Sequence, residues 1–212
     1  MKLYLLLPLL VLQLAACKKD STPAKDYNTI MKNTAWTGQA NLTGKPSQLI
    51  SMSFSENGQM VWYDVQNAVT GSWKVESGLV IVTLSNGSSF TTKLANENTF
   101  TDIVNLPSTN LILTAATLNT VAEPVLDNTV WTSSVNNIVI RFKPGSKLDL
   151  EIGPNGITKY TGLSYTKDAK TVRFSASSAY KWFVTFNSAT TMKGVNIFSP
   201  DPTIYLFDVV KQ

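Results

Sequence analysis

The sequence predicts an all-β protein made of two tandem antiparallel β units that follow an N-terminal leader. Apolar residues alternate with serines at 50–54, which is the period of a half-buried strand. Turn-forming pairs such as Asn57-Gly58 and Asn86-Gly87 recur at intervals of roughly 8–12 residues, as in sandwiches and closed barrels. The segment NTAWTG at 33–38 returns as NTVWTS at 128–133, which indicates a duplication.

The duplication extends beyond this segment, because six more pairs of similar stretches follow in the same order. The aligned copies span 33–118 and 128–212, and 119–127 forms a short connector that contains Glu123-Pro124. At 86 and 85 residues, each copy is short, so we expect a filled barrel or a compact sandwich rather than an open cup. The pattern alone does not distinguish two separate barrels from one merged sheet system.

The strands follow from the alternation and from the turns that separate them. In the first copy we expect strands at 35–42, 49–54, 59–66, 71–76, 79–84, 89–95, 99–105 and 111–118. In the second copy we expect them at 130–135, 137–143, 147–152, 158–166, 170–175, 180–186, 192–198 and 203–209. A short helical turn is expected at 27–32, ahead of Trp36.

The first sixteen residues have the pattern of a secretory signal. Lys2 precedes an uncharged, mostly apolar run at 3–16, which ends in two alanines. As a helix this run would rise about 21 Å, which is short of the ~30 Å hydrocarbon core of a bilayer. We therefore predict a signal peptide at 1–16.

The four residues at 14–17, LAAC, resemble the lipobox of bacterial lipoproteins, in which the cysteine is acylated and becomes the mature N-terminus. The resemblance implies lipidation of Cys17 and an outer-membrane lipoprotein of the bacterial cell envelope, facing either the periplasm or the cell exterior. The alternative is an ordinary buried cysteine beside a generic signal. The predicted organisation is a signal peptide at 1–16, a lipidated tether at 17–26, and β units at 27–119 and 120–212.

Composition excludes several classes of chemistry. The chain has no histidine and one cysteine, which removes His-based catalysis, His-ligated metals and an internal disulfide. The formal charge of +4 falls to +3 when 1–16 is removed with its one lysine, and the remaining basic residues are scattered. We therefore expect no catalytic residues, no metal, no cofactor and no nucleic-acid partner.

A second resemblance concerns the β units. Each begins with a tryptophan in its first strand, at Trp36 and Trp131, and 71–73 reads Gly-Ser-Trp. This order resembles the lipocalin-like (calycin) lipoproteins of Bacteroidota, although the family's opening Gly-x-Trp is absent at 34–36. The resemblance implies small antiparallel barrels.

The candidate binding residues come from aligning 61–65 with 148–152, which places Trp62 opposite Asp149 and Asp64 opposite Glu151. Acidic residues rarely face a dry core, so this face is expected to be solvated and Trp62 to share it. An exposed tryptophan beside an acid is typical of a sugar-stacking or protein-contact site.

Each of these residues also has a purely structural interpretation. Trp62 could be covered by a loop, by the other unit or by a partner chain. Asp149 and Glu151 could form an acid–base pair, or they could simply lie on a solvated surface. Tyr63, on the opposite face, is expected in the core. The other tryptophans are expected to pack inside, at Trp36, Trp73, Trp131 and Trp182.

These observations favour a non-enzymatic binding or interaction module, held to the membrane by its lipid anchor. Its partner would be a glycan, a small apolar ligand or an envelope protein. One alternative is a lipocalin-like carrier of an apolar ligand, which requires an enclosed pocket of about 300 Å³ or more. Another is a carboxylate-based glycan hydrolase, which requires Asp149 and Glu151 to lie together in a cleft.

Overall fold

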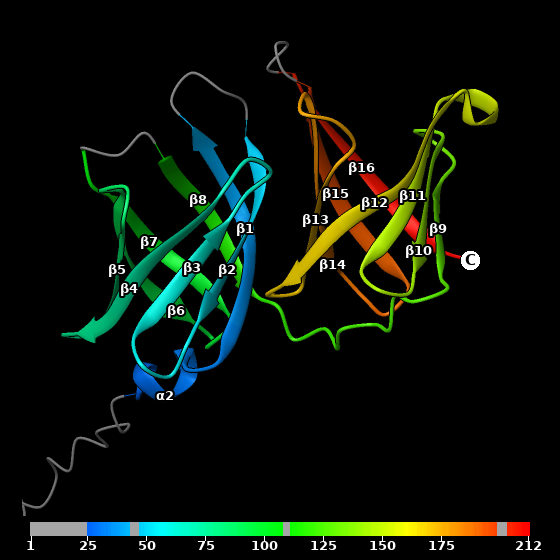
Figure 1. Ribbon diagram of the computed structural model, residues 1–212. Coiled ribbons are helices and arrows are strands. Elements are labelled where there is room, and N and C mark those ends of the chain that lie inside the picture. Colours follow the sequence, from blue (N-terminus) through cyan, green and yellow to red (C-terminus); the bar gives the residue numbers. More distant parts are fainter. Residues whose placement is uncertain (1–24, 43–46, 108–110, 199–202) are drawn as a thin grey trace, which may run out of the picture.

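The structure is a computed structural model, which describes residues 25–42, 47–107, 111–198 and 203–212. It consists of two tandem closed barrels, each of eight antiparallel strands joined in chain order (Figure 1). The predicted all-β class is confirmed, and the units are separate barrels rather than one merged sheet. Eight-stranded antiparallel barrels are consistent with lipocalin-like repeats. The predicted signal peptide and Cys17 lie outside the described residues.

The first barrel follows a one-turn helix, α2 (Tyr27–Met31). Its strands are β1 (Thr34–Leu42), β2 (Gln48–Phe54), β3 (Gln59–Tyr63), β4 (Ala68–Glu76), β5 (Leu79–Leu84), β6 (Ser89–Ala95), β7 (Thr99–Asn105) and β8 (Leu111–Leu118). Most bounds agree with the predicted ones to within one residue. The exception is the β3–β4 turn, where β3 ends and β4 begins three residues earlier than expected.

The second barrel repeats this order. Its elements are β9 (Val130–Ser133), β10 (Ile138–Lys143), β11 (Lys147–Ile152), the 3₁₀ turn η1 (Pro154–Gly156), β12 (Thr158–Asp168), β13 (Thr171–Ser175), β14 (Tyr180–Phe186), β15 (Thr191–Phe198) and β16 (Ile204–Lys211). Turn residues with positive φ separate several of these strands, for example Gly145, where glycine has no Cβ to strain the backbone.

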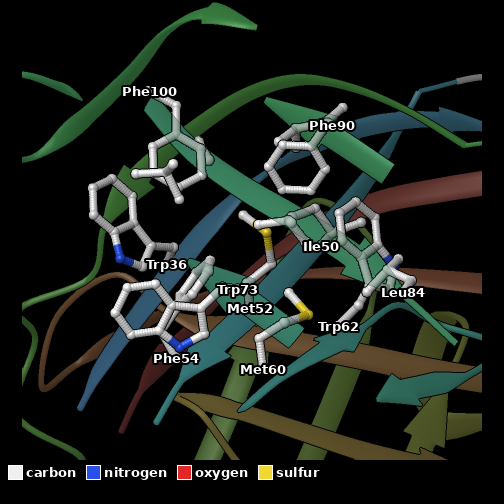
Figure 2. Packing of buried hydrophobic residues seen from close by; sticks show 14 of the residues in the cluster. Trp36, Ile50, Met52, Phe54, Met60, Trp62, Trp73, Leu84, Phe90 and Phe100 are labelled. Atoms are coloured by element: carbon white, nitrogen blue, oxygen red, sulfur yellow. The ribbon is translucent and has the colours of Figure 1, made fainter. Parts of the chain in front are cut away.

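Large side chains fill the interior of the first barrel. Trp36, Trp62 and Phe54 are almost fully buried there, together with methionines and further rings (Figure 2). Trp36 stacks on Phe100 with ring centroids 4.3 Å apart, and Phe100 in turn packs against Phe90. The second barrel has an equivalent cluster built around Trp131, which is also fully buried. The expected core positions of Trp36, Trp73, Trp131 and Trp182 are confirmed.

The repeated NTxW motif closes one end of each barrel. In the first barrel, Trp36 Nε1 donates to Thr34 Oγ1 at 3.0 Å, and that hydroxyl donates to the carbonyl of Met31 in α2. The second copy repeats this network with Trp131, Thr129 and Leu126 of the connector. Met31 and Leu126 are both buried in their respective cores. Figure 1 shows α2 and the connector at the same end of the molecule.

The two barrels contact each other through a small apolar cluster formed by their outer faces. Its buried members are Tyr63 and Val65 of the first barrel and Phe183, Val195 and Ile197 of the second. The guanidinium of Arg173 lies 5.0 Å from the centre of the Tyr63 ring, which adds a cation–π contact across the interface. Tyr63 is therefore buried as expected, but between the barrels rather than inside one.

Candidate functional site

The predicted binding residues Trp62 and Asp64 lie inside the first barrel. Trp62 is fully buried, and its Nε1 donates to Asp64 Oδ2 at 3.2 Å. The Asp64 carboxylate is 3 % exposed and also accepts the backbone N–H groups of Gln66 and Asn67. The expectation that Trp62 lies on a solvated face is wrong: this pair supports the β3–β4 turn and offers no surface to a partner.

The error comes from a one-residue slip in the alignment of the two copies. Phe54 pairs with Met60 across β2 and β3, and Phe142 pairs with Leu148 across β10 and β11. Met60 therefore corresponds to Leu148, and Trp62 corresponds to Leu150 rather than to Asp149. Because side chains alternate between faces along a strand, a shift of one residue exchanges the inner and outer faces.

Asp149 and Glu151 lie on the outer face of the second barrel, and each contacts a cation. Lys143 Nζ is 2.5 Å from Asp149 Oδ2, and Arg141 Nε is 3.4 Å from Glu151 Oε1. The hydrogen bond from Lys143, more than any other contact, holds the pKa of Asp149 below its usual range. A glycosidase acid needs the opposite shift, toward a raised pKa. The two carboxylates thus form part of a surface charge ladder, away from Trp62 and Asp64.

The indole N–H groups reveal a different site. Four of the five tryptophans donate a hydrogen bond: Trp36 and Trp131 to threonines, Trp62 to Asp64, and Trp73 to the carbonyl of Ser55. Trp182 is 1 % exposed, and its Nε1 has no partner among the described residues. An unpaired buried donor is destabilising by about 1–3 kcal/mol, so each one needs an explanation. Among the described residues, Asn41 Oδ1, Gln48 Nε2 and Arg173 Nε are also buried without a partner, but none of these residues lines the cavity that contains both Trp182 and Asn196.

Trp182 lies in a partly open cavity of about 230 Å³ at the mouth of the second barrel, the end opposite the connector. The cavity is lined by Asn136, Ile138, Ile152, Tyr180, Trp182, Asn196, Phe198, Tyr205 and Phe207. The strand registers explain this convergence, because Trp182 is directly opposite Asn196, which in turn is opposite Tyr205. Directly paired residues point to the same face of a sheet, here the interior.

A second unpaired polar atom lies beside the indole. Asn196 is 9 % exposed, and no group in the described part of the chain pairs with its Oδ1. The equivalent asparagine of the first barrel, Asn105, is opposite Phe90 and has both amide atoms satisfied, since it donates to the carbonyl of Leu113 and accepts from the N–H of Leu113. At this pair of positions the second barrel therefore differs from its repeat, because neither the Trp182 indole N–H nor the Asn196 carbonyl oxygen has a partner among the described residues. Both atoms are closed off from solvent, so a ligand reaches them only when the side chains that cover them move aside.

The walls of the cavity are aromatic and uncharged. The rings of Tyr180 and Phe198 lie with their centroids 4.6 Å apart at the rim, and Phe207 packs edge-on against Trp182. None of the lining residues carries a charge. Of the connections at this end, 134–137, 153–157 and 176–179 contain no charged residue, and 199–203 contains one, Asp201. The arrangement suits a small neutral ring that both accepts and donates a hydrogen bond.

Two further findings concern the described part of the chain. No group of three or more acidic or cysteine side chains is placed to hold a metal ion. No helix there has the length and hydropathy needed to cross a bilayer.

Sequence reasoning assigned Trp182 to the core and did not single out Asn196. One signal was present in the sequence: β14 and β15 carry a tryptophan and an asparagine at positions where the first copy has Phe90 and Asn105. The sequence could not show that the second pair lacks partners, because Leu113 satisfies Asn105 from a neighbouring strand.

The comparisons with known proteins add no family to this picture. No protein-family model, no curated protein and no solved structure matches the chain.

Proposed function

We propose that the protein is a lipid-anchored, non-enzymatic binding module of the bacterial cell envelope, and that the mouth of its second barrel takes a small neutral ligand. The observation that carries the proposal is the pair of buried, unpaired polar atoms, Trp182 Nε1 and Asn196 Oδ1, on two neighbouring residues that line one uncharged aromatic cavity. The anchor rests on the lipobox at 14–17. Because α2 follows the tether and closes the opposite end of the first barrel, both mouths would face away from the membrane.

The size of the cavity limits the ligand. At ~30 Å³ for each water in the liquid, 230 Å³ corresponds to about eight waters, or one small ring with its substituents. Burying an ion there without a partner would be strongly unfavourable, so the ligand is neutral. A wholly apolar ligand would leave both polar atoms unpaired, which disfavours the lipocalin-like carrier; the cavity is also below the 300 Å³ that the carrier requires.

A carboxylate-based hydrolase has less support. Asp149 and Glu151 are paired with cations on the outer surface, and the candidate cavity contains no carboxylate. Binding without turnover is the function that this site favours.

The binding site can be tested with the full chain in lipid nanodiscs and a panel of neutral rings: glucose, N-acetylglucosamine, nicotinamide, uracil and indole. We expect at least one to bind, and Trp182→Phe to weaken its affinity about threefold to tenfold through loss of one hydrogen bond. Calorimetric titration measures the change. The matched control is Trp62→Phe, which alters a paired indole in the other barrel and should leave binding unchanged. Equal affinities for wild type and Trp182→Phe would contradict the site.

The anchor has its own test. We expect Cys17→Ser to abolish incorporation of labelled fatty acid and to move the protein from the membrane fraction to the soluble fraction of cells. Stable anchoring needs more than one acyl chain, each contributing about 0.8 kcal/mol per buried CH₂, so loss of the acceptor thiol removes it entirely. Labelling of the Cys17→Ser protein at the wild-type level would contradict lipidation at this residue.

A further inference from the structure

The two barrels close differently. In the first barrel, the first and last strands, β1 and β8, are joined by seven residue pairs from Trp36–Leu118 to Leu42–Leu111. In the second barrel, the corresponding strands β9 and β16 pair only at Thr132–Val210 and Trp131–Lys211. Within the described chain, the stretch 204–209 of β16 therefore has no strand partner on the β9 side. This leaves a seam in the barrel wall beside the mouth.

A larger cleft lies on the outside of this seam, between the two barrels. Its volume is about 870 Å³, and it is lined by Gln39, Ser47, Gln48 and Leu49 of the first barrel and by residues of the β9–β10 connection, β15, β16 and the C-terminus of the second. Asn136 and Phe207 line both this cleft and the mouth cavity. Along β16, Tyr205 lines only the cavity, while Leu206 and Asp208 line only the cleft. The two spaces therefore adjoin across the unpaired part of β16.

The cleft combines hydroxyl and amide groups with a few apolar side chains. Polar lining comes from serine, threonine, glutamine and asparagine, and the apolar side chains of the lining are Leu49, Val135, Leu206, Phe207 and Val210. Lys193 and Asp208 are its charged members, one of each sign. Such a lining favours a neutral, polyhydroxylated chain over an ionic or fully apolar one.

We propose that the protein binds a neutral oligosaccharide by its end, with the terminal ring in the mouth cavity and the following rings in the cleft between the barrels. The inference rests on the proposed function of the mouth. A sugar hydroxyl both accepts and donates, so neighbouring hydroxyls of one ring can satisfy Trp182 Nε1 and Asn196 Oδ1 together once the side chains that shield these atoms shift. The apolar face of the ring packs on the aromatic walls.

An extended peptide is the competing occupant, because it could pair with the free edge of β16. Peptide main chain on that edge would satisfy the seam but would leave the two unpaired atoms of the mouth without partners. An oligosaccharide would occupy both the mouth cavity and the cleft between the barrels.

The test compares chain lengths and blocks the two spaces separately, with the full chain in nanodiscs. The probes are glucose with maltotetraose and cellotetraose, and N-acetylglucosamine with its β-1,4 tetramer. We expect one tetrasaccharide to bind at least tenfold more tightly than its monosaccharide. Leu206→Arg, which fills the cleft from an exposed position, should remove that gain and leave monosaccharide affinity unchanged. The matched control is Val104→Arg, at an exposed valine of the first barrel that does not line the cleft.

The outcomes separate this inference from the proposed function. Tetrasaccharides that bind no more tightly than monosaccharides, or that are insensitive to Leu206→Arg, overturn the end-on mode. Binding of nicotinamide, uracil or indole that depends on Trp182, with no saccharide bound, overturns the inference while the mouth site stands. Leu206-dependent binding of an unstructured peptide, again with no saccharide bound, overturns it in favour of strand addition.

Discussion

Alanine in place of Trp36 or Trp131 is expected to lower the free energy of unfolding of the affected barrel by about 3–5 kcal/mol, as for other large aromatic side chains removed from a core. Each indole is fully buried, and its N–H donates to the threonine that links the barrel to α2 or to the connector. The substitution therefore leaves a cavity and a threonine oxygen that has lost its hydrogen-bond donor. Trp36 additionally loses its stacking on Phe100. Urea unfolding followed by far-ultraviolet circular dichroism measures the loss.

The control for the alanine variants of Trp36 and Trp131 is Val135→Ala. Val135 is 86 % exposed, so its truncation should change the free energy of unfolding by less than about 0.5 kcal/mol. A loss of similar size for Val135→Ala and Trp36→Ala would contradict the role of the NTxW motif in closing the barrels.

A second large difference is expected between two tryptophan-to-phenylalanine variants. Trp62→Phe removes a buried hydrogen bond to the carboxylate of Asp64, which is worth about 1.5–3 kcal/mol. Trp182→Phe removes an N–H that has no partner within the described ranges, so only the packing loss remains. Both variants lose the same part of the ring, and the difference between their free energies of unfolding therefore reports the hydrogen bond. We expect Trp62→Phe to be the less stable protein by about 1–3 kcal/mol.

This comparison also bears on why the second barrel keeps Trp182. A polar atom without a partner weakens the fold, and proteins retain such features where binding requires them. Equal losses for the two variants in thermal and urea unfolding would mean that the Trp182 indole is satisfied in solution. The case for a ligand at the mouth would then lose its main support.

The strand positions were predictable because their signals are local. Alternation of apolar and polar residues and glycine or asparagine at turns act over a few residues, and they placed most strand ends within one residue. The β3–β4 turn was misplaced because Asp64 and Val65 continue the alternation of β3. The structure instead uses the Asp64 carboxylate to accept two backbone N–H groups and begin a turn there.

The candidate site was harder to predict because it depends on register. Aligning Trp62 with Asp149 instead of Leu150 moved it from the interior to the surface, since a strand presents alternate residues to opposite faces. Trp182 and Asn196 become a site only when β14 and β15 pair and no other strand supplies their partners. A pattern of neighbouring residues in the sequence does not show that a hydrogen-bond partner is missing.

By itself, the sequence determined that this is a duplicated all-β chain without histidine chemistry or an internal disulfide, because composition, alternation and turn residues are properties of short segments. Only the tertiary structure decided that the two copies close as separate barrels, that Trp62 is satisfied by Asp64, and that the buried N–H of Trp182, a residue that lines a cavity, meets no partner in the part of the chain that is described. The reason is that many hydrogen-bond partners in a barrel come from a neighbouring strand. Which residues of two strands face each other depends on the register of the folded barrel.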